Sequence, residues 1–396
     1  MYKKNISRSG YKRDDEDFGI EMKKYILGIV LTISISINVI FVYTELYIHY
    51  ITKNPISIKQ SELYSDGGGT FANRLIEIYK NGWSEQPPKR VVSIKNKLDF
   101  IINGNPGYSR YKSAEEGWLF VALMENARCR NDKGLILKLQ NLFENHILNN
   151  EVQNIHEAVN GLFAIRLYEQ LKVPEYKAFA DKTYQWLNHH YINDKGILYG
   201  IKDLPGVDGY GMSVPFLTAY SYAFNCNEAK EMALHNIECW IKMGGVNPLT
   251  GFPYMAISLA HPSLPSGYSN WGRGTAWWVI GLSDIDKNSL SPEYSAYVEK
   301  LEENLTEIWL KEHKFTQLLH QSDKIDLSAT LPIIYYLHKK GLIEITKSDI
   351  DDISRYYENG ALACSSGPND GYSLSPYSGR NPLADAFLLK IINECF

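Results

Sequence analysis

A single carboxylate in the middle of the chain stands in a setting suited to proton transfer. Asp208 lies between glycines in GVDGYGMSVPF, residues 206–216, directly before an apolar segment that reads as a helix. A carboxylate at this point can simply cap the helix. Where it is partly removed from water and its pKa is raised, it can also give and take a proton. The choice between the two depends on whether similar places recur along the chain.

Polar or glycine-bearing segments also precede five other apolar helical segments. They are SAEEG before Trp118, QNIHEAVNG before Leu162, SNWGRG before Thr275, DKIDLSA before Thr330 and SPYSGRN before Pro382. If these helices run parallel, all six segments meet at one rim, where free N–H groups and positive dipole ends form a bowl. Such a bowl suits an anionic ligand, for example a uronic acid carboxylate. The alternative is N-caps and turns, as Asp326 and Ser328 would be. Because several segments carry Trp, Tyr, His or Arg, we favour the bowl.

Two kinds of helix alternate along the chain after Gly69. One kind is apolar nearly all round, which is typical of helices buried on most sides. Its members begin at Gly117, Gly161, Met212, Thr275, Ser328 and Pro382. The other kind has a charged face, as in the segments from Pro174, Asn227, Ser291 and Lys347. Apolar helices therefore form an inner layer, and amphipathic helices cover it.

The spacing of the inner helices predicts an all-α fold, the closed (α/α)6 barrel. They recur at intervals of about 40 to 65 residues, as helical-hairpin repeats do. The helix from Thr70 would pair with the C-terminal helix and close the ring. An open superhelix of the same hairpins is the alternative. No segment alternates convincingly like a β-strand.

Composition limits the classes of partner. The net charge of −4 gives no electrostatic case for nucleic acid. The 28 Tyr and 8 Trp suit carbohydrate, although core packing is the more common reason for such residues. The five cysteines have no metal-site spacing and no disulfide framework, so we expect neither a metal nor a cofactor. One cysteine pair could still form a bridge outside the cytosol.

The N-terminal part of the chain contains a candidate membrane anchor. Residues 24–43, KYILGIVLTISISINVIFVY, carry no charge after the first residue and are about long enough to span a bilayer. More basic residues precede this segment than follow it, which places the N-terminus in the cytoplasm and the body outside the cytoplasmic membrane. A cleaved signal peptide is the rival, but no small-residue cleavage site follows. The sequence predicts a tail at 1–23, a linker at 44–69 and a barrel at 70–396.

From about Ser113 to the C-terminus the chain resembles the unsaturated glucuronyl and rhamnogalacturonyl hydrolases, glycoside hydrolase families 88 and 105. VDGYGMSVPFLTAY is similar to the family segment that supplies its essential Asp, and NWGRGTAWWVIGLSD to the segment that lines its uronate site. IDLSATLPIIYYLHKKGL and ALACSSGPNDGYSLSPYSGRNPLADAFLL resemble two later segments in the same order.

The resemblance implies an (α/α)6 barrel whose chemistry is hydration of a double bond. Such enzymes add water across the C4=C5 bond that a polysaccharide lyase leaves on a uronic acid. On this basis Asp208 is the general acid and base, and Arg273 pairs with the uronate carboxylate. The implied sugar-binding aromatic residues are Tyr210, Trp271, Trp277 and Trp118.

One family feature is changed in this chain. The family usually carries a second Asp before the helix matching GLFAIRLYEQL, where this chain has NIHEAVNG. Glu157 is the residue expected to replace that carboxylate, and His156 is expected to bind substrate. A different substrate or a loss of catalytic function are the alternatives.

Three functions follow from these observations. The first is an anchored enzyme that hydrates unsaturated uronyl residues of an acidic oligosaccharide or polysaccharide. The second is an inverting glycosidase with Asp208 and Glu157 as its carboxylate pair, which would need to lie about 6.5–9.5 Å apart. The third is a membrane-tethered polysaccharide-binding or assembly protein without activity.

Overall fold

The computed structural model describes residues 22–39, 42, 66–79, 113–201, 203–260, 264–320, 325–358, 361–362, 364–366, 378–379 and 381–396. The chain divides into two compact units, of which one holds the N-terminal helix and the other the helical barrel. The helix at Met22–Val39 is long and apolar enough to cross a membrane. Most of the expected tail at 1–23 and of the expected linker at 44–69 lies outside the described residues.

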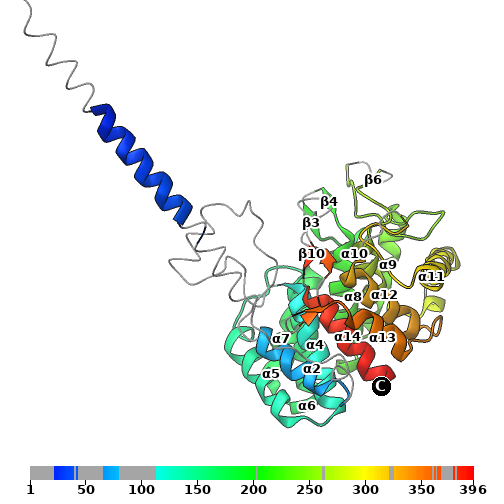
Figure 1. Ribbon diagram of the computed structural model, residues 1–396. Coiled ribbons are helices and arrows are strands. Elements are labelled where there is room, and N and C mark those ends of the chain that lie inside the picture. The colour runs from blue at the N-terminus through cyan, green and yellow to red at the C-terminus, as the bar shows by residue number, and fades with distance from the viewer. Residues whose placement is uncertain are drawn as a thin grey trace, which may run out of the picture. The chain divides into compact units, whose positions relative to one another are not determined.

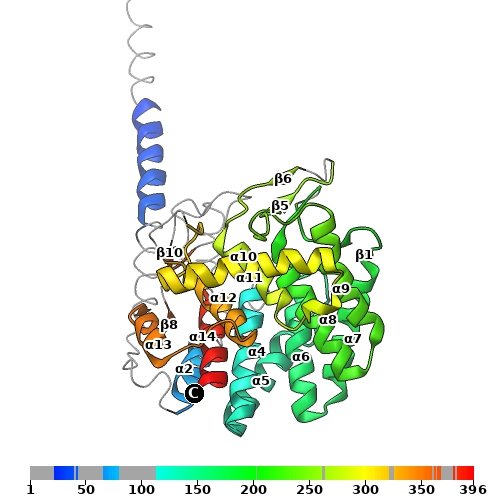
Figure 2. The ribbon, with the colours of Figure 1, turned by 90° about the vertical axis from the view of Figure 1, so that its right-hand side faces the viewer.

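Six apolar helices form a closed inner ring (Figures 1 and 2). Each contacts the next in chain order, and the last contacts the first, which excludes an open superhelix. The ring consists of α4 (Ala114–Cys129), α6 (Glu157–Leu171), α8 (Tyr210–Phe224), α10 (Gly272–Leu282), α12 (Leu327–Lys339) and α14 (Pro382–Cys395). The predicted (α/α)6 architecture is confirmed.

Within the described residues, six further helices cover the ring from outside. They are α2 (Gly69–Tyr79), α5 (Lys133–His146), α7 (Pro174–His189), α9 (Asn227–Lys242), α11 (Pro292–Glu312) and α13 (Lys347–Ser354). As expected, α2 lies at the closure of the ring, where it contacts both α4 and α14. The Tyr79 hydroxyl donates to Asp385 Oδ2 of α14 at 3.0 Å. Since Asp385 is fully buried, this bond satisfies a carboxylate that the core would otherwise destabilise.

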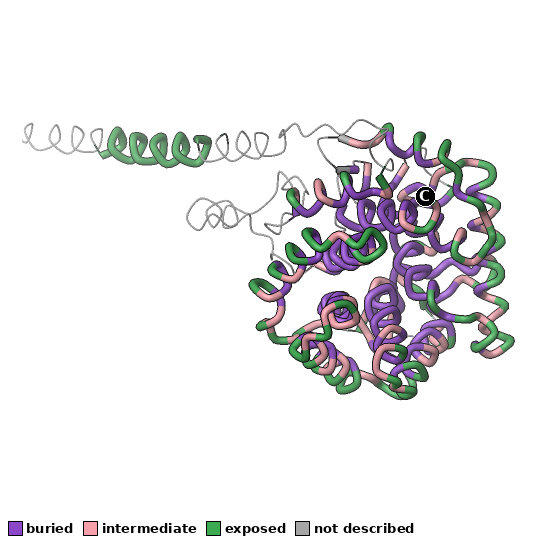
Figure 3. Tube along the Cα trace, turned by 90° about the horizontal axis from the view of Figure 1, so that it is seen from below, coloured by how far each residue is buried: buried purple, intermediate pink, exposed green. Residues whose placement is uncertain are grey.

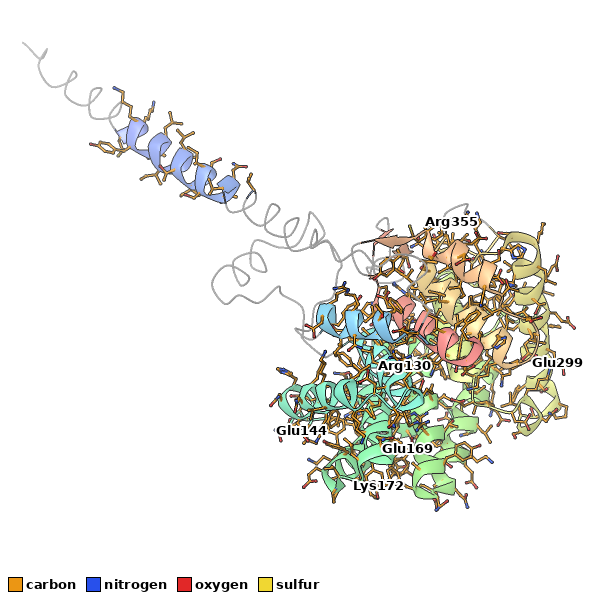
Figure 4. The ribbon with its side chains drawn as sticks, turned by 60° about the horizontal axis from the view of Figure 1, so that its bottom comes forward. Arg130, Glu144, Glu169, Lys172, Glu299 and Arg355 are labelled. Atoms are coloured by element: carbon orange, nitrogen blue, oxygen red, sulfur yellow. The ribbon has the colours of Figure 1, made fainter. Side chains whose placement is uncertain are left out.

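Burial separates the two layers of helices. In Figure 3 the buried parts of the chain gather in the middle of the barrel, and the exposed parts lie on its outer turns. Charged side chains such as Lys172, Glu299 and Arg355 lie at the periphery (Figure 4). This pattern is the one that alternating apolar and amphipathic segments dictate.

Short antiparallel hairpins connect the helices, and the sequence did not predict them. They pair β1 (Tyr191–Ile192) with β2 (Gly196–Ile197), β3 (Gly200–Ile201) with β4 (Leu204–Pro205), β5 (Ala256–Ile257) with β6 (Pro265–Ser266), β7 (Tyr357–Glu358) with β8 (Ala361–Leu362), and β9 (Ser365–Ser366) with β10 (Ser378–Gly379). Each strand has two residues, which is too few to show an alternating pattern. Figures 1 and 2 draw β6 and β10 at the end of the barrel opposite the C-terminus.

The inner helices run parallel, as predicted, and their N-terminal ends share one end of the barrel, here called the rim. At the rim, strand β9 joins the N-terminal ends of two inner helices: Arg273 of α10 donates to Ser366, and Ser366 donates to Asp326 before α12. Side-chain caps begin several of these helices. Ser113 accepts from the Glu116 N–H before α4, and Asp326 accepts from the Ser328 N–H before α12.

The opposite end of the barrel is held by a cluster of paired charges around a cavity of about 260 Å³. Glu125 of α4 binds Arg166 of α6 at 3.3 Å and also Lys390 of α14. Asp284, just after α10, pairs with Lys339 of α12 at 2.5 Å. These neighbouring cations hold the pKa of both carboxyl groups below their usual range despite burial. Because the charges are paired, the inner helices meet here without an uncompensated buried charge.

A proline inside α8 links two inner helices that are not neighbours in the ring. Pro215 has no N–H, so the carbonyl of Gly211 four residues earlier loses its normal helical donor. The indole N–H of Trp118 in α4 donates to that carbonyl at 3.2 Å. Gly211 also packs so closely on Trp277 of α10 that a Cβ would lie 2.6 Å from its carbonyl oxygen. The first turn of α8 is therefore held in fixed register with the second turns of α4 and α10.

Candidate active site

Asp208 lies at the rim, in the 3₁₀ turn Val207–Gly209 that leads into α8. The residue is partly buried, and its Oδ1 is covered and has no hydrogen-bond partner among the described residues. The pKa of Asp208 is raised from 3.8 to about 7, mainly because burial disfavours the charged form; the nearby Arg273 guanidinium reduces this rise, and the carboxylate of Glu115 adds to it. A carboxyl group with this pKa exchanges its proton readily near neutral pH.

Arg273 brings a buried positive charge to the same place. It is 5% exposed, and its Nη1 donates to the Ser366 carbonyl of β9 at 2.6 Å. The N–H of Ser366 in turn donates to Asp326 Oδ1 at 3.1 Å, so β9 bridges the starts of α10 and α12. The guanidinium also lies 5.7 Å from the Trp271 ring. Arg273 is therefore held rigidly within electrostatic reach of Asp208.

His156, directly before α6, is paired with a tyrosine beside Asp208. Its Nε2 lies 2.8 Å from the Tyr199 hydroxyl, and its covered Nδ1 has no partner among the described residues. Burial lowers the pKa of His156, so the ring is neutral at pH 7, although Glu115 opposes the shift. Gly209 packs directly against the Tyr199 side chain: a Cβ atom at Gly209 would lie only 2.7 Å from the Cβ of Tyr199. This contact places the His156–Tyr199 pair next to Asp208.

Glu157 is the first residue of α6 and is 2% exposed. Its Oε2 accepts a hydrogen bond from Asn160 Nδ2, one turn later in the same helix, at 2.8 Å. The role of Glu157 as a second catalytic carboxylate stays a prediction.

The four predicted sugar-binding aromatic residues are largely buried. Trp271 and Trp118 are 5% exposed, and Trp277 and Tyr210 are 2% exposed. The Tyr210 ring packs against Trp240 and Trp278, which is typical of a core aromatic residue, and burial raises the pKa of its hydroxyl. The Trp118 ring packs against Phe387 at a tilt of 48°, and its N–H donates to the Gly211 carbonyl. Substrate contact by these four residues stays a prediction.

Three residues near the site, Glu115, Tyr199 and Ser366, were given no role by the sequence analysis, although Glu115 lies in the expected rim segment SAEEG. Glu115 stands in the first turn of α4, where an acidic residue is ordinary, so its type gave no signal. Tyr199 and Ser366 belong to loops and two-residue strands without any periodic pattern. Only the tertiary structure brings them to Asp208, His156 and Arg273.

At the level of chemistry, the rim combines a carboxyl group that titrates near pH 7 with a buried guanidinium and a neutral imidazole. The carboxyl group can act as acid or base, and the guanidinium can bind a carboxylate. This combination is suited to proton transfer on an anionic substrate.

The comparisons with known proteins show a family and a fold for this chain. The model of the family described as Glycosyl Hydrolase Family 88 matches residues 101–349. A search of curated proteins found none that matches the chain. Among solved structures, a possible member of family 105 from Salmonella enterica is 15% identical with a TM-score of 0.64, over 86% of this chain and 96% of that one.

Two further solved structures share the fold. An unsaturated glucuronyl hydrolase specific for heparin is 15% identical with a TM-score of 0.59, over 83% of this chain and 95% of that one. An inactive variant of an α-1,6-mannanase from Salegentibacter, in complex with α-1,6-mannotetrose, is 13% identical with a TM-score of 0.58. It aligns over 86% of this chain and all of its own.

Proposed function

The chain belongs to Glycosyl Hydrolase Family 88, and we propose that it hydrates an unsaturated uronyl residue of an acidic oligosaccharide, with Asp208 as general acid and base. The observation that carries the proposal is the Asp208 carboxyl group, which has a pKa of about 7 and lies near the buried cation of Arg273. A group half protonated near neutrality can both give and take a proton in one cycle.

The proposed reaction conserves every proton. Asp208 donates its proton to C4 of the C4=C5 double bond, and a water molecule adds to C5. The resulting carboxylate of Asp208 takes a proton from that water, so the residue returns to its starting state. The product is a hemiketal at C5, which opens and releases the rest of the oligosaccharide. Arg273 would hold the substrate carboxylate on C5 and fix the ring over Asp208.

An acidic substrate is favoured over a neutral one by the buried guanidinium of Arg273 at the rim. The fold alone does not distinguish them, since the glucuronyl hydrolase and the α-1,6-mannanase share it. A buried guanidinium favours a carboxylate because the attraction is weakly screened there. The glucuronyl hydrolase is named as specific for heparin, which also supports a uronyl substrate.

The reaction can be followed through the double bond that it consumes. Purified protein mixed with lyase-generated unsaturated oligosaccharides should abolish the ultraviolet absorbance of the conjugated uronate. A matched sample of the same oligosaccharides with saturated ends should stay unchanged. Release of reducing sugar without loss of absorbance would reject hydration. It would favour an inverting glycosidase with Asp208 and Glu157 as its two catalytic carboxylates. If the oligosaccharide binds but neither loses absorbance nor releases reducing sugar, the protein is a polysaccharide-binding protein without activity.

The apolar helix Met22–Val39 supports a proposed location for the enzyme. It would anchor the chain in the cytoplasmic membrane with the N-terminus inside and the barrel outside, because basic residues are more frequent before the helix than after it. Alkaline phosphatase fused after Phe396 should then be active in whole cells, since it needs the exported compartment. A reporter that works only in the cytosol should be inactive when it is fused at the same position. Activity of that reporter would show that the barrel lies inside the cytoplasm. Loss of the helix from the mature protein would instead identify a signal peptide.

A further inference from the structure

We propose that Asp326 is a positioning residue of this site, which fixes the guanidinium of Arg273 in place through the backbone of Ser366. The inference rests on the proposed function for its catalytic meaning. The contacts that it describes exist without substrate, so they can also be tested independently of any reaction.

Two hydrogen bonds of a single residue connect Asp326 to Arg273. The Ser366 carbonyl accepts from Arg273 Nη1 at 2.6 Å, and the Ser366 N–H donates to Asp326 Oδ1 at 3.1 Å. Because the N–H and the carbonyl belong to the same short stretch of backbone, a shift of one carries the other with it. Arg273 and Ser366 are 5% exposed and Asp326 is 2% exposed, so little water is available to replace either bond. Loss of the bond to Asp326 should therefore release the guanidinium.

Asp326 is itself held firmly enough to serve as a support. Its Oδ1 also accepts from the Ser328 N–H at 3.0 Å and from the Ser328 hydroxyl at 2.6 Å. Its own N–H donates to the Phe315 carbonyl at 2.9 Å. The next residue, Leu327, donates its N–H to the Cys364 carbonyl at 3.1 Å, directly before β9. The start of α12 is thus joined to the β9 segment through a side chain and through the backbone.

The base of the Arg273 side chain is fixed separately, by close packing between the starts of α10 and α12. The Gly272 N–H donates to the Gln317 carbonyl at 2.9 Å. A Cβ atom at Gly272 would lie 2.1 Å from the Thr316 carbonyl oxygen, so only glycine fits there. This packing fixes the backbone of Arg273 but not the far end of its long, flexible side chain. The Ser366 carbonyl supplies a second point of attachment at that end.

Such positioning matters most for the recognition of a charged group. A side chain that is ordered before the ligand arrives loses less conformational freedom on binding. The planar fork of arginine pairs with a carboxylate through bonds of defined direction. A guanidinium released from Ser366 would keep its charge but not its orientation. We therefore expect weaker binding of the acidic substrate and little change in the chemical step.

The motif IDLSA, residues 325–329, gains a second function from these contacts. Helix capping is the alternative that the sequence leaves open for Asp326 and Ser328, and the structure confirms that Asp326 caps α12. The same oxygen atom also holds Ser366, so one carboxylate begins an inner helix and supports the guanidinium. Because the two functions require side chains of different length, they can be separated.

Two substitutions at this position separate them. Asp326→Ser keeps a good helix cap, but its shorter side chain cannot also reach the Ser366 N–H. In this variant KM for the unsaturated oligosaccharide should rise by roughly three- to tenfold, as for the loss of one hydrogen bond, while kcat stays within about twofold. Asp326→Asn keeps the length and an oxygen that accepts the same bonds, so it should recover the original KM. The same oligosaccharide with its carboxylate amidated should bind all three proteins alike.

The guanidinium can also be followed without substrate. NMR spectra of the arginine side chains report how strongly each guanidinium is held, and the Arg273 signal is assigned by its absence from Arg273→Lys. The Arg273 Nη signal should be protected from solvent exchange in the unaltered protein and in Asp326→Asn. In Asp326→Ser it should be broadened by exchange.

Asp132→Ser is the matched control. Asp132 begins the outer helix α5 as Asp326 begins α12, with its Oδ1 accepting from the Leu135 N–H at 2.9 Å. The same substitution there tests a changed aspartate cap alone, and it should alter neither KM nor the Arg273 signal.

Three outcomes would overturn the positioning role of Asp326. The first is an unchanged Arg273 signal, or an unchanged KM in active protein, in Asp326→Ser. The second is the same defect in Asp326→Asn, because the negative charge and not the hydrogen bond would then be the cause. The third is an equal loss of affinity for the amidated oligosaccharide, which would indicate general damage to the fold. A changed Arg273 signal in a protein that leaves the ultraviolet absorbance unchanged would preserve the positioning role and reject only the proposed function.

Discussion

Turnover of unsaturated oligosaccharides should fall by about 10²–10⁴-fold in Asp208→Asn, while KM changes little. Asparagine keeps the shape and most of the hydrogen bonding of the side chain but has no proton of suitable pKa to transfer. In the unaltered enzyme, turnover should also decline as the pH rises above about 7, because the acid form of Asp208 is lost there. Steady-state kinetics from pH 5 to 9 measure both effects.

The stability of Asp208→Asn is the control for this experiment, and its sign follows from linkage. The native pKa of about 7 lies above the ordinary value of 3.8, so the folded protein holds a proton that the unfolded chain releases. That contribution is complete below pH 3.8 and is lost as the pH rises through 7. The unaltered protein should lose about 3 kcal/mol of this contribution between pH 5 and pH 8, and Asp208→Asn should not, so the variant should gain stability relative to the unaltered protein over that interval. Urea unfolding at the two pH values measures the difference.

Near-normal turnover in Asp208→Asn would show that the residue is only a helix cap, since asparagine caps about as well as aspartate. Reduced turnover with equally reduced stability at pH 8 would indicate damage to the fold. Only a large loss of turnover in a protein that is at least as stable supports proton transfer by Asp208.

Arg273→Ala should raise KM for the unsaturated substrate by about 10²-fold or more, because the substrate carboxylate loses a buried, charge-assisted partner. It should also move the alkaline limb of turnover to higher pH, since Arg273 lowers the pKa of Asp208. Arg273→Lys keeps the charge but not the planar fork, so it should retain the pH profile and recover only part of the affinity.

The structure supplies a control for the loss of Arg273. Its Nη1 holds the Ser366 carbonyl, so truncation leaves that buried acceptor without this donor and loosens β9. A neutral competitive inhibitor, the same oligosaccharide with its carboxylate amidated, separates the two effects. It should bind Arg273→Ala and the unaltered enzyme alike. An equal loss of affinity for both ligands would assign Arg273 to structure and not to carboxylate recognition.

The barrel could be predicted because its layers differ in composition along the chain. The segment from Met212 is apolar on all sides, and the segment from Asn227 has a charged face; the structure places them as α8 and α9 of the inner and outer layers. Apolar and amphipathic segments alternate along the chain, so inner and outer helices alternate in the fold. Six inner helices are enough to close a ring. The motif around Asp208 likewise stands at a helix start, as its glycines indicate.

The contacts that tune the site could not be predicted in the same way. Pro215 signals that the Gly211 carbonyl lacks a donor, but nothing in the sequence names Trp118 as the replacement. Ser366 meets Arg273 across 93 residues of chain, from a strand of two residues. Such pairings depend on tertiary geometry, which local patterns do not encode.

Ring closure by α14 determines when the barrel can fold during its synthesis. Lys390 and Glu125, which join the last inner helix to the first, are 265 residues apart in the chain. Until α14 has been made, one apolar side of α4 has no neighbour, and partial rings expose surface that favours aggregation. Closure over so long a loop is also slow. The fold of the barrel therefore cannot be completed before the segment containing α14 has been synthesised, and a chaperone that covers the exposed side of α4 would protect the incomplete ring.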